Sequence, residues 1–153
     1  LGDHWTGGQL LLSYEIEENI LVKILGLEDQ IYESVQLIQD KNNQFHIKPK
    51  LNGTNDYEML FDTGASLTSL SEANRKTFLV LGLVKETGQS IGIVNADGVQ
   101  SQKVVYTCSF KIGSKEVRDI RVVFTEGTPL FGMNILNHLD GWKIQGDELI
   151  FKK

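Results

Sequence analysis

Short runs of alternating apolar residues, separated by turn-forming residues, constrain the fold of this chain most. The 153 residues include 15 glycines and only two prolines. Strands are usually about 3–10 residues long and are bounded by Gly, Asn or Asp turns, which is the pattern seen here. A chain of this length buries one core, so the sequence predicts a mainly β fold in a single domain.

The expected strands follow one another along the whole chain. Residues 10–17 and 20–27 alternate and predict a hairpin, whereas 31–39 fits a helix or a strand and is interpreted as a strand. Asn52-Gly53 predicts a turn, although Asn52-Gly53-Thr54 also matches a glycosylation sequon. Further strands are expected at 44–51, 57–61, 67–70, 109–112 and 117–124, and a terminal hairpin at 142–144 and 148–151.

Two short helices are expected between these strands. Ser71 is the predicted N-cap of a helix over residues 72–81, which Gly82 ends. A second helix is expected over residues 133–139, after Gly132 and before Asp140-Gly141.

Composition and charge exclude several classes of partner. The formal net charge is −5 and the Lys and Arg residues are scattered singly, which argues against nucleic acid or an anionic membrane. No apolar run approaches the roughly 18 residues that a membrane helix needs. The sequence starts at Leu1, so it is compatible with a preceding signal peptide or anchor, and a periplasmic or exported location stays open.

Cysteine and histidine do not indicate a metal site or a cofactor. Cys108 is alone and lies in an alternating run, which favours a buried apolar role over a reactive thiol. His4, His46 and His138 lie far apart in the sequence and lack the spacing of metal ligands. We therefore expect no metal and no cofactor.

Asp62 is the candidate for chemistry. The apolar run 57–61 ends in Asp62-Thr63-Gly64, which places a carboxylate in a sharp turn whose glycine allows close approach of the backbone. Two backbone amides and the Thr63 hydroxyl could hold that carboxylate in one orientation, as a general acid or base requires. The alternative is a structural Asx turn, in which Asp62 only bonds the backbone.

The stretch Phe61-Asp62-Thr63-Gly64-Ala65-Ser66 resembles the active-site loop of the aspartic proteases, in particular the single-domain retropepsin-like family of retroviruses and bacteria. Leu130-Phe131-Gly132, which runs into the second expected helix, resembles the family's second motif. The resemblance implies a retropepsin-like acid-protease barrel over residues 43–153, with residues 1–42 as an N-terminal β extension packed on the same domain. It also implies that Asp62, Thr63 and Gly64 form the catalytic loop.

A hairpin is expected over residues 90–105, because Asp97-Gly98 separates two alternating runs. An ordinary exposed hairpin would give the same pattern. The resemblance implies instead a flap that closes over the substrate, although its tip contains only Gly98 where retroviral flaps are glycine-rich. The residues then expected to contact substrate are Ala65, Val94, Asn95, Ala96, Asp97 and Gly98.

The resemblance implies an aspartic endopeptidase that acts on peptides or proteins. Such an enzyme needs two carboxylates that share one proton, and this chain contains one Asp-Thr-Gly. The second carboxylate would come from a second copy, so a homodimer is expected, with Thr63 hydroxyl contacts across its axis. Ser66 stands where retroviral members usually carry Asp.

Two other reaction classes fit the sequence less well than proteolysis, and one non-catalytic function stays open. A phosphorylated aspartate would need a nearby Lys and further acidic residues, which do not follow Asp62. Ser66 lacks the second glycine of a nucleophile elbow, since Thr68 stands there. The alternative that stays open is a non-catalytic retropepsin-like binding or regulatory module.

Overall fold

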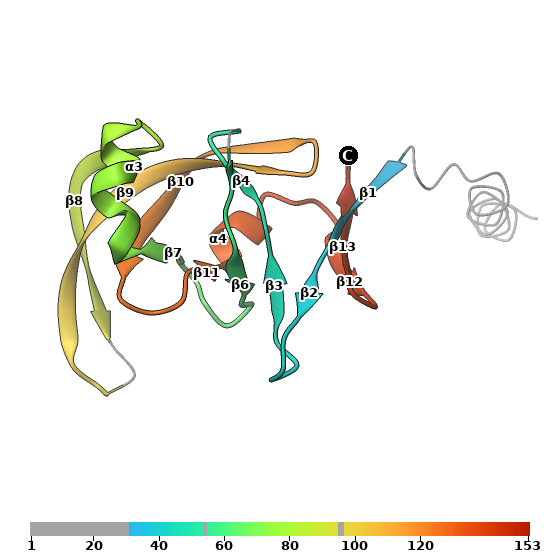
Figure 1. The fold of residues 1–153 in the computed structure, drawn as a ribbon, viewed down its shortest axis with the longest axis horizontal. Helices are drawn as coiled ribbons and strands as arrows, with labels where there is room; N and C mark the ends of the chain where they lie inside the picture. Colours follow the sequence, from blue (N-terminus) through green and yellow to red (C-terminus); the bar gives the residue numbers. More distant parts are fainter. Residues whose placement is uncertain (1–30, 54, 95–96) are drawn as a thin grey trace, which may run out of the picture.

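The computed structural model describes residues 31–53, 55–94 and 97–153 of the chain, and they are mainly β, as predicted (Figure 1). The described strands form two sheets. Each sheet has two end strands, so neither closes into a barrel and the expected barrel is an open arrangement. The strands and hairpin expected within residues 10–27 lie outside the described residues.

The larger sheet carries the hairpins and the candidate site. Its strands follow the order β2 (Ile38–Gln39), β3 (Phe45–Ile47), β6 (Met59–Phe61), β11 (Leu130–Phe131), β7 (Thr68–Ser71), β10 (Lys115–Thr125), β9 (Gln100–Ile112), β4 (Lys50–Leu51) and β5 (Asn55–Asp56). Strand β8 (Val84–Val94) pairs with β9 outside this order. Asn52 and Gly53 both have positive φ between β4 and β5, which confirms the predicted turn.

The smaller sheet joins the two ends of the described chain. Its order is β1 (Tyr32–Gln36), β13 (Glu148–Lys152) and β12 (Lys143–Gln145), so β13 is paired on both edges within one chain. The terminal hairpin and the strand interpretation of 31–39 are confirmed. Glu33 of β1 also accepts hydrogen bonds from the Ser114 amide and hydroxyl, which ties this strand to the β9–β10 turn.

Two long antiparallel hairpins dominate the larger sheet. Strands β8 and β9 pair from Val94↔Gln100 to Val84↔Cys108, which confirms the expected hairpin and extends both of its strands. The pairing shifts register between Glu86 and Ser90. The separately expected strand 109–112 is the end of β9, because that strand continues without interruption to Ile112.

The core lies on one face of the β9–β10 hairpin and under the shorter strands. Tyr106, Cys108 and Phe110 alternate along β9 and are all buried, as period-2 strand geometry requires. Phe110, Phe131 and Phe151 are fully buried, and burial of such a side chain contributes about 1.5–3 kcal/mol relative to exposure. The buried position of Cys108 confirms its expected role, and burial raises the pKa of its thiol to about 12.

The first expected helix is present but begins differently. Its first turn is a 3₁₀-helix over Glu72–Asn74, followed by α3 (Arg75–Val80), and Gly82 ends it with φ of 71°. The Ser71 side chain does not cap it, which corrects the prediction. The Ser71 amide instead donates to the Tyr57 hydroxyl. Burial raises the pKa of that hydroxyl.

Two other elements are shorter than expected. The strand predicted over 44–51 is divided into β3 and β4 at Pro49, because proline has no amide to donate to a ladder. The second helix, α4 (Met133–Leu136), continues as turns to Leu139. None of the described helices is long and apolar enough to span a bilayer.

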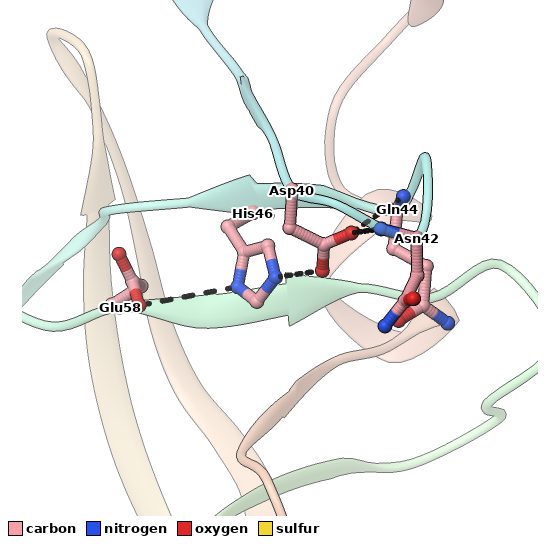
Figure 2. A network of polar contacts seen from close by, with 5 residues as sticks. All are labelled: Asp40, Asn42, Gln44, His46 and Glu58. Atoms are coloured by element: carbon pink, nitrogen blue, oxygen red, sulfur yellow. Dashed lines mark hydrogen bonds and ion pairs between the residues drawn. The ribbon is translucent and has the colours of Figure 1, made fainter.

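Asp40 organises the turn between β2 and β3. Its Oδ1 accepts hydrogen bonds from the amides of Asn42 and Gln44, and its Oδ2 lies 2.7 Å from Nε2 of His46. Figure 2 shows the His46 ring between Asp40 and Glu58, whose Oε2 lies 4.0 Å from Nδ1. The hydrogen bond with His46, followed by that with the Gln44 amide, lowers the pKa of Asp40.

The lowered pKa of Asp40 predicts how stability depends on pH. The carboxylate stabilises the fold above the unfolded pKa of about 3.9. That contribution is lost as the pH falls through the lower folded pKa. Asp40→Asn should therefore lower the free energy of unfolding at neutral pH, and the difference from wild type should shrink in acid. Urea denaturation at neutral pH and in acid measures the free energy of unfolding of wild type and of Asp40→Asn. Asp56→Asn, in the exposed strand β5, is the control. A difference that does not change with pH would contradict the assignment.

Candidate active site

The loop that carries Asp62 crosses the end of a buried strand. Strand β6 runs parallel to β11, with Phe61 opposite Phe131, and β11 also pairs antiparallel with β7. The loop over residues 62–67 therefore connects two strands that lie on either side of β11. The Asp62 amide donates to the Phe131 carbonyl at 3.1 Å, so Asp62 still belongs to the sheet.

The Asp62 carboxylate is held by the turn that it begins. Its Oδ1 accepts a hydrogen bond from the Gly64 amide at 2.9 Å, and the Ala65 amide donates to the Asp62 carbonyl at 3.2 Å. Asp62 is half-buried, whereas Thr63 and Gly64 are exposed at the tip. Of the two amides and the Thr63 hydroxyl that were expected to hold the carboxylate, the structure shows only the Gly64 amide.

Gly132 lies directly beneath this loop. A Cβ at position 132 would stand 2.8 Å from the Leu67 carbonyl carbon and 3.0 Å from the Ala65 carbonyl oxygen, and both neighbours are backbone atoms. The Met133 amide donates to the Ala65 carbonyl at 2.8 Å. Only glycine fits at position 132 while the loop and the start of α4 remain in contact.

Thr68 and Asn134 join the loop to two other elements. Asn134 Oδ1 accepts hydrogen bonds from the Thr68 amide at 2.9 Å and from its hydroxyl at 2.6 Å. The Gly132 amide donates to the same Thr68 hydroxyl, and Asn134 Nδ2 donates to the Arg121 carbonyl of β10. Thr68 is fully buried, so these bonds satisfy a polar group that would otherwise be costly inside the protein.

Aromatic contacts support the residue before Asp62. The Phe61 ring stacks on Phe131 with centroids 5.9 Å apart, and the Trp142 ring meets it edge-on at 6.1 Å. Trp142 directly precedes β12, so the start of the terminal hairpin packs beside the Asp62 loop. These contacts fix the end of β6 that delivers the carboxylate.

Comparisons with known proteins agree with this geometry. The family described as "gag-polyprotein putative aspartyl protease" matches residues 47–138, which is more than half of the chain and includes both the Asp62 loop and Gly132. The chain belongs to this retropepsin-like family. No curated protein sequence matches the chain significantly.

A solved structure supports the fold independently of this family assignment. The retropepsin-like aspartic protease from Rickettsia conorii superposes with a TM-score of 0.56. The two sequences are 22% identical, and the match covers 79% of this chain and 90% of that one. At this identity the likeness concerns the retropepsin-like fold.

The other predicted site residues of this retropepsin-like chain lie at two places. Ala65 belongs to the Asp62 loop, whereas Val94, Asp97 and Gly98 lie at the turn of the β8–β9 hairpin. Asp97 Oδ1 accepts a hydrogen bond from the Val99 amide, which shapes that turn. In Figure 1 the hairpin turn and the loop after β6 both lie toward the lower side of the molecule. Asn95 and Ala96 lie outside the described residues.

The sequence did not predict the contacts that support the Asp62 loop. Thr68 and Asn134 are 66 positions apart, and no motif of the sequence connects them. A polar Thr68 within an apolar run was the available signal, because a buried hydroxyl implies a partner. Within the three described stretches of the chain, no three His, Cys, Asp or Glu side chains are placed to hold a metal ion.

Gly132→Ala should destabilise the protein, because the new Cβ would meet backbone atoms that cannot turn aside. We expect a loss of about 1–3 kcal/mol in the free energy of unfolding, as for overpacked core sites. Urea denaturation measures this loss. Gly127→Ala is the matched control, since nothing lies within 4 Å of a Cβ there. Equal effects of both substitutions would mean that the loop does not rest on Gly132.

Proposed function

We propose that this chain is an aspartic endopeptidase whose water molecule is activated by two Asp62 carboxylates, one from each protomer of a homodimer. The observation that carries the proposal is the hydrogen bonding of the Asp62 carboxylate. One oxygen is fixed by the Gly64 amide, and within the three described stretches Oδ2 has no hydrogen-bond partner. A half-buried carboxylate held in this way can orient a water molecule.

The reaction needs one carboxylate in each protonation state. The ionised Asp62 takes a proton from water as the water oxygen attacks the scissile carbonyl carbon. The protonated Asp62 of the second copy donates a hydrogen bond to the carbonyl oxygen as negative charge develops there. Collapse of the tetrahedral intermediate breaks the C–N bond, and the departing amine takes up a proton from the pair.

In this proposal the second carboxylate comes from another copy of the chain, since the given sequence contains one Asp-Thr-Gly. A two-fold axis beside Asp62 would place two identical loops together, and an isologous interface of this kind is the commonest among soluble oligomers. Thr63 and Gly64 are exposed at the loop tip, which favours this arrangement. Their exposed atoms are those that a second loop would meet first.

The open edge of β12 supports a second contact region. Strand β13 is already paired on both sides, so a partner cannot pair with it, whereas β12 ends its sheet. Trp142 links the start of β12 to Phe61, next to Asp62. A copy that packs on the Asp62 loop would thus also reach the exposed side chains of Lys143, Ile144 and Gln145.

The substrate is proposed to lie between the loop and the β8–β9 hairpin. An extended peptide can bond the backbone of a hairpin while its side chains enter pockets on alternate sides. The residues proposed to contact it are Ala65, Val94, Asn95, Ala96, Asp97 and Gly98.

Asp62→Asn should abolish peptide hydrolysis, because the amide can neither accept a proton from water nor share one with its partner. Its oxygen can still accept the Gly64 hydrogen bond, so the free energy of unfolding should change little. Cleavage of a peptide library, read by mass spectrometry, measures activity. Asp56→Asn serves as the control. Activity retained in Asp62→Asn would refute the mechanism, and a wild-type protein that binds peptides without cleaving them would favour the non-catalytic module.

Thr63→Val should weaken association of the two copies, because it removes a hydroxyl from each loop tip. Specific activity should then fall more steeply on dilution than in wild type, since only the dimer holds two carboxylates. Sedimentation and the cleavage assay should be run over the same range of protein concentration. Thr77→Val, on the exposed surface of α3, is the control. A strictly monomeric protein whose rate per molecule is independent of concentration would contradict the dimer.

A further inference from the structure

Two lysines face each other on the exposed surface of the larger sheet. Lys50 of β4 pairs directly with Lys111 of β9, and both residues are exposed. Like charges that lie directly opposite each other on neighbouring strands destabilise a sheet. Within the three described stretches, neither ammonium group forms an ion pair or a hydrogen bond. An anion bound between the two lysines would remove their repulsion.

The acidic side chains beside this pair leave its charge uncompensated. Asp56 of β5 lies opposite Lys50, and Glu116 of β10 lies opposite Lys111, so four charges form one row across four strands. The Glu116 carboxylate is paired with Arg118, whose Nε lies 3.1 Å from Oε1. Asp56 forms no ion pair with Lys50. Two neighbouring positive charges therefore stand open to solvent in a protein whose formal net charge is −5.

A hollow of about 300 Å³ opens beside Lys111, and we call it the lysine hollow. Its polar lining includes Asn52, Ser109 and Ser114. Its volume lies at the lower end of ligand pockets, which span roughly 300–1,000 Å³. Directly opposed residues of an antiparallel pair have Cβ atoms about 5 Å apart, so the ammonium group of Lys50 can reach the same ligand as that of Lys111.

Polar groups of the lysine hollow are free to bind a ligand. The side-chain amide of Asn52 forms no hydrogen bond with a described residue. The Ser109 hydroxyl oxygen accepts a hydrogen bond from the Asp119 amide at 3.3 Å, so its own proton can be donated. Ser114 is engaged, because its amide and hydroxyl both donate to Glu33. The hollow thus offers amide and hydroxyl donors next to two ammonium groups.

The charge of the lysine pair indicates the class of anion. Two ammonium groups match a phosphate monoester, which carries close to two negative charges above its second pKa of about 6. Lysine binds phosphate as a point charge, whereas planar recognition of a carboxylate favours arginine. A phosphate group would fill only part of the hollow. The rest would hold a polar organic group that can bond Asn52 and Ser109.

We propose that Lys50, Lys111 and the lysine hollow bind a phosphate ester whose organic part is polar and about the size of a sugar. The β4–β5 and β9–β10 turns, which flank this site, lie toward the upper side of Figure 1, whereas the loop after β6 lies toward the lower side. The site is therefore separate from the proposed catalytic centre, and the inference does not depend on the proposed function.

Glucose 6-phosphate is the probe for this site. Titrated into isotope-labelled wild-type protein at neutral pH, it should shift the amide NMR signals of Asn52, Gly53 and Lys111. Lys111→Gln should weaken binding roughly tenfold, because a charge-assisted hydrogen bond is lost. Lys76→Gln is the matched control, since it removes the same charge from the exposed surface of α3 and should leave the affinity unchanged.

Asp56→Asn tests the sign of the electrostatic effect. It removes the negative charge opposite Lys50, so glucose 6-phosphate should bind about twofold more tightly than to wild type. Affinity should fall below a pH of about 6, where the phosphate ester loses one charge while both lysines stay protonated.

Two further probes separate the phosphate from the organic part. Inorganic phosphate should bind more weakly than glucose 6-phosphate, and glucose should cause no shifts. Inorganic phosphate that binds as tightly would mean an adventitious ion only, and a phosphoserine peptide that binds more tightly would mean a protein ligand. Either result would overturn the inference, as would equal affinities of Lys111→Gln and Lys76→Gln. No step needs peptide cleavage, so the outcome is independent of whether the chain is a protease.

Discussion

The contact between Gly132 and the loop over residues 62–67 is the constraint on which the candidate site depends. Backbone meets backbone there, so the loop can cross β11 only where no side chain intervenes. The crossing brings Asp62 to the end of β6 and aligns Ala65 with the start of α4. A carboxylate on an unsupported turn would sample many orientations, whereas this one is placed by a packed strand.

Buried hydrogen bonds extend that constraint to the rest of the fold. Thr68 and Asn134 connect the loop to α4 and, through the Arg121 carbonyl, to β10. Every group in this set is paired, which makes such a network stabilising rather than costly. The β8–β9 hairpin differs, because most side chains of β8 are exposed and backbone pairing with β9 holds it. Exposed side chains and few core contacts are the features that the proposed closure over a substrate needs in this hairpin.

The single Asp-Thr-Gly and the sheet topology both constrain how the proposed dimer can form. The given sequence contains one Asp-Thr-Gly, so the proposed mechanism takes its second carboxylate from another copy of the chain. Retroviral dimers weave both chain termini into one sheet, but here β1 and β12 already cover both edges of β13. The open edge of β12 begins beside Trp142, which contacts Phe61 next to the Asp62 loop. Association and catalysis would then depend on neighbouring surfaces of the same molecule.

The local features of this protein follow from short stretches of its sequence. Alternation of apolar residues predicted most of the described strands, Asp97-Gly98 predicted the long hairpin, and Gly82 predicted a helix end. Each of these features depends on residues that are neighbours in the sequence. The Asp62 turn was likewise readable from its tripeptide. Three features became visible only in the folded chain: β11 lies between β6 and β7, Asn134 bonds Thr68, and Leu67 and Ile91 line one cavity. These contacts join residues far apart in the chain, and no local pattern records which distant partners will meet.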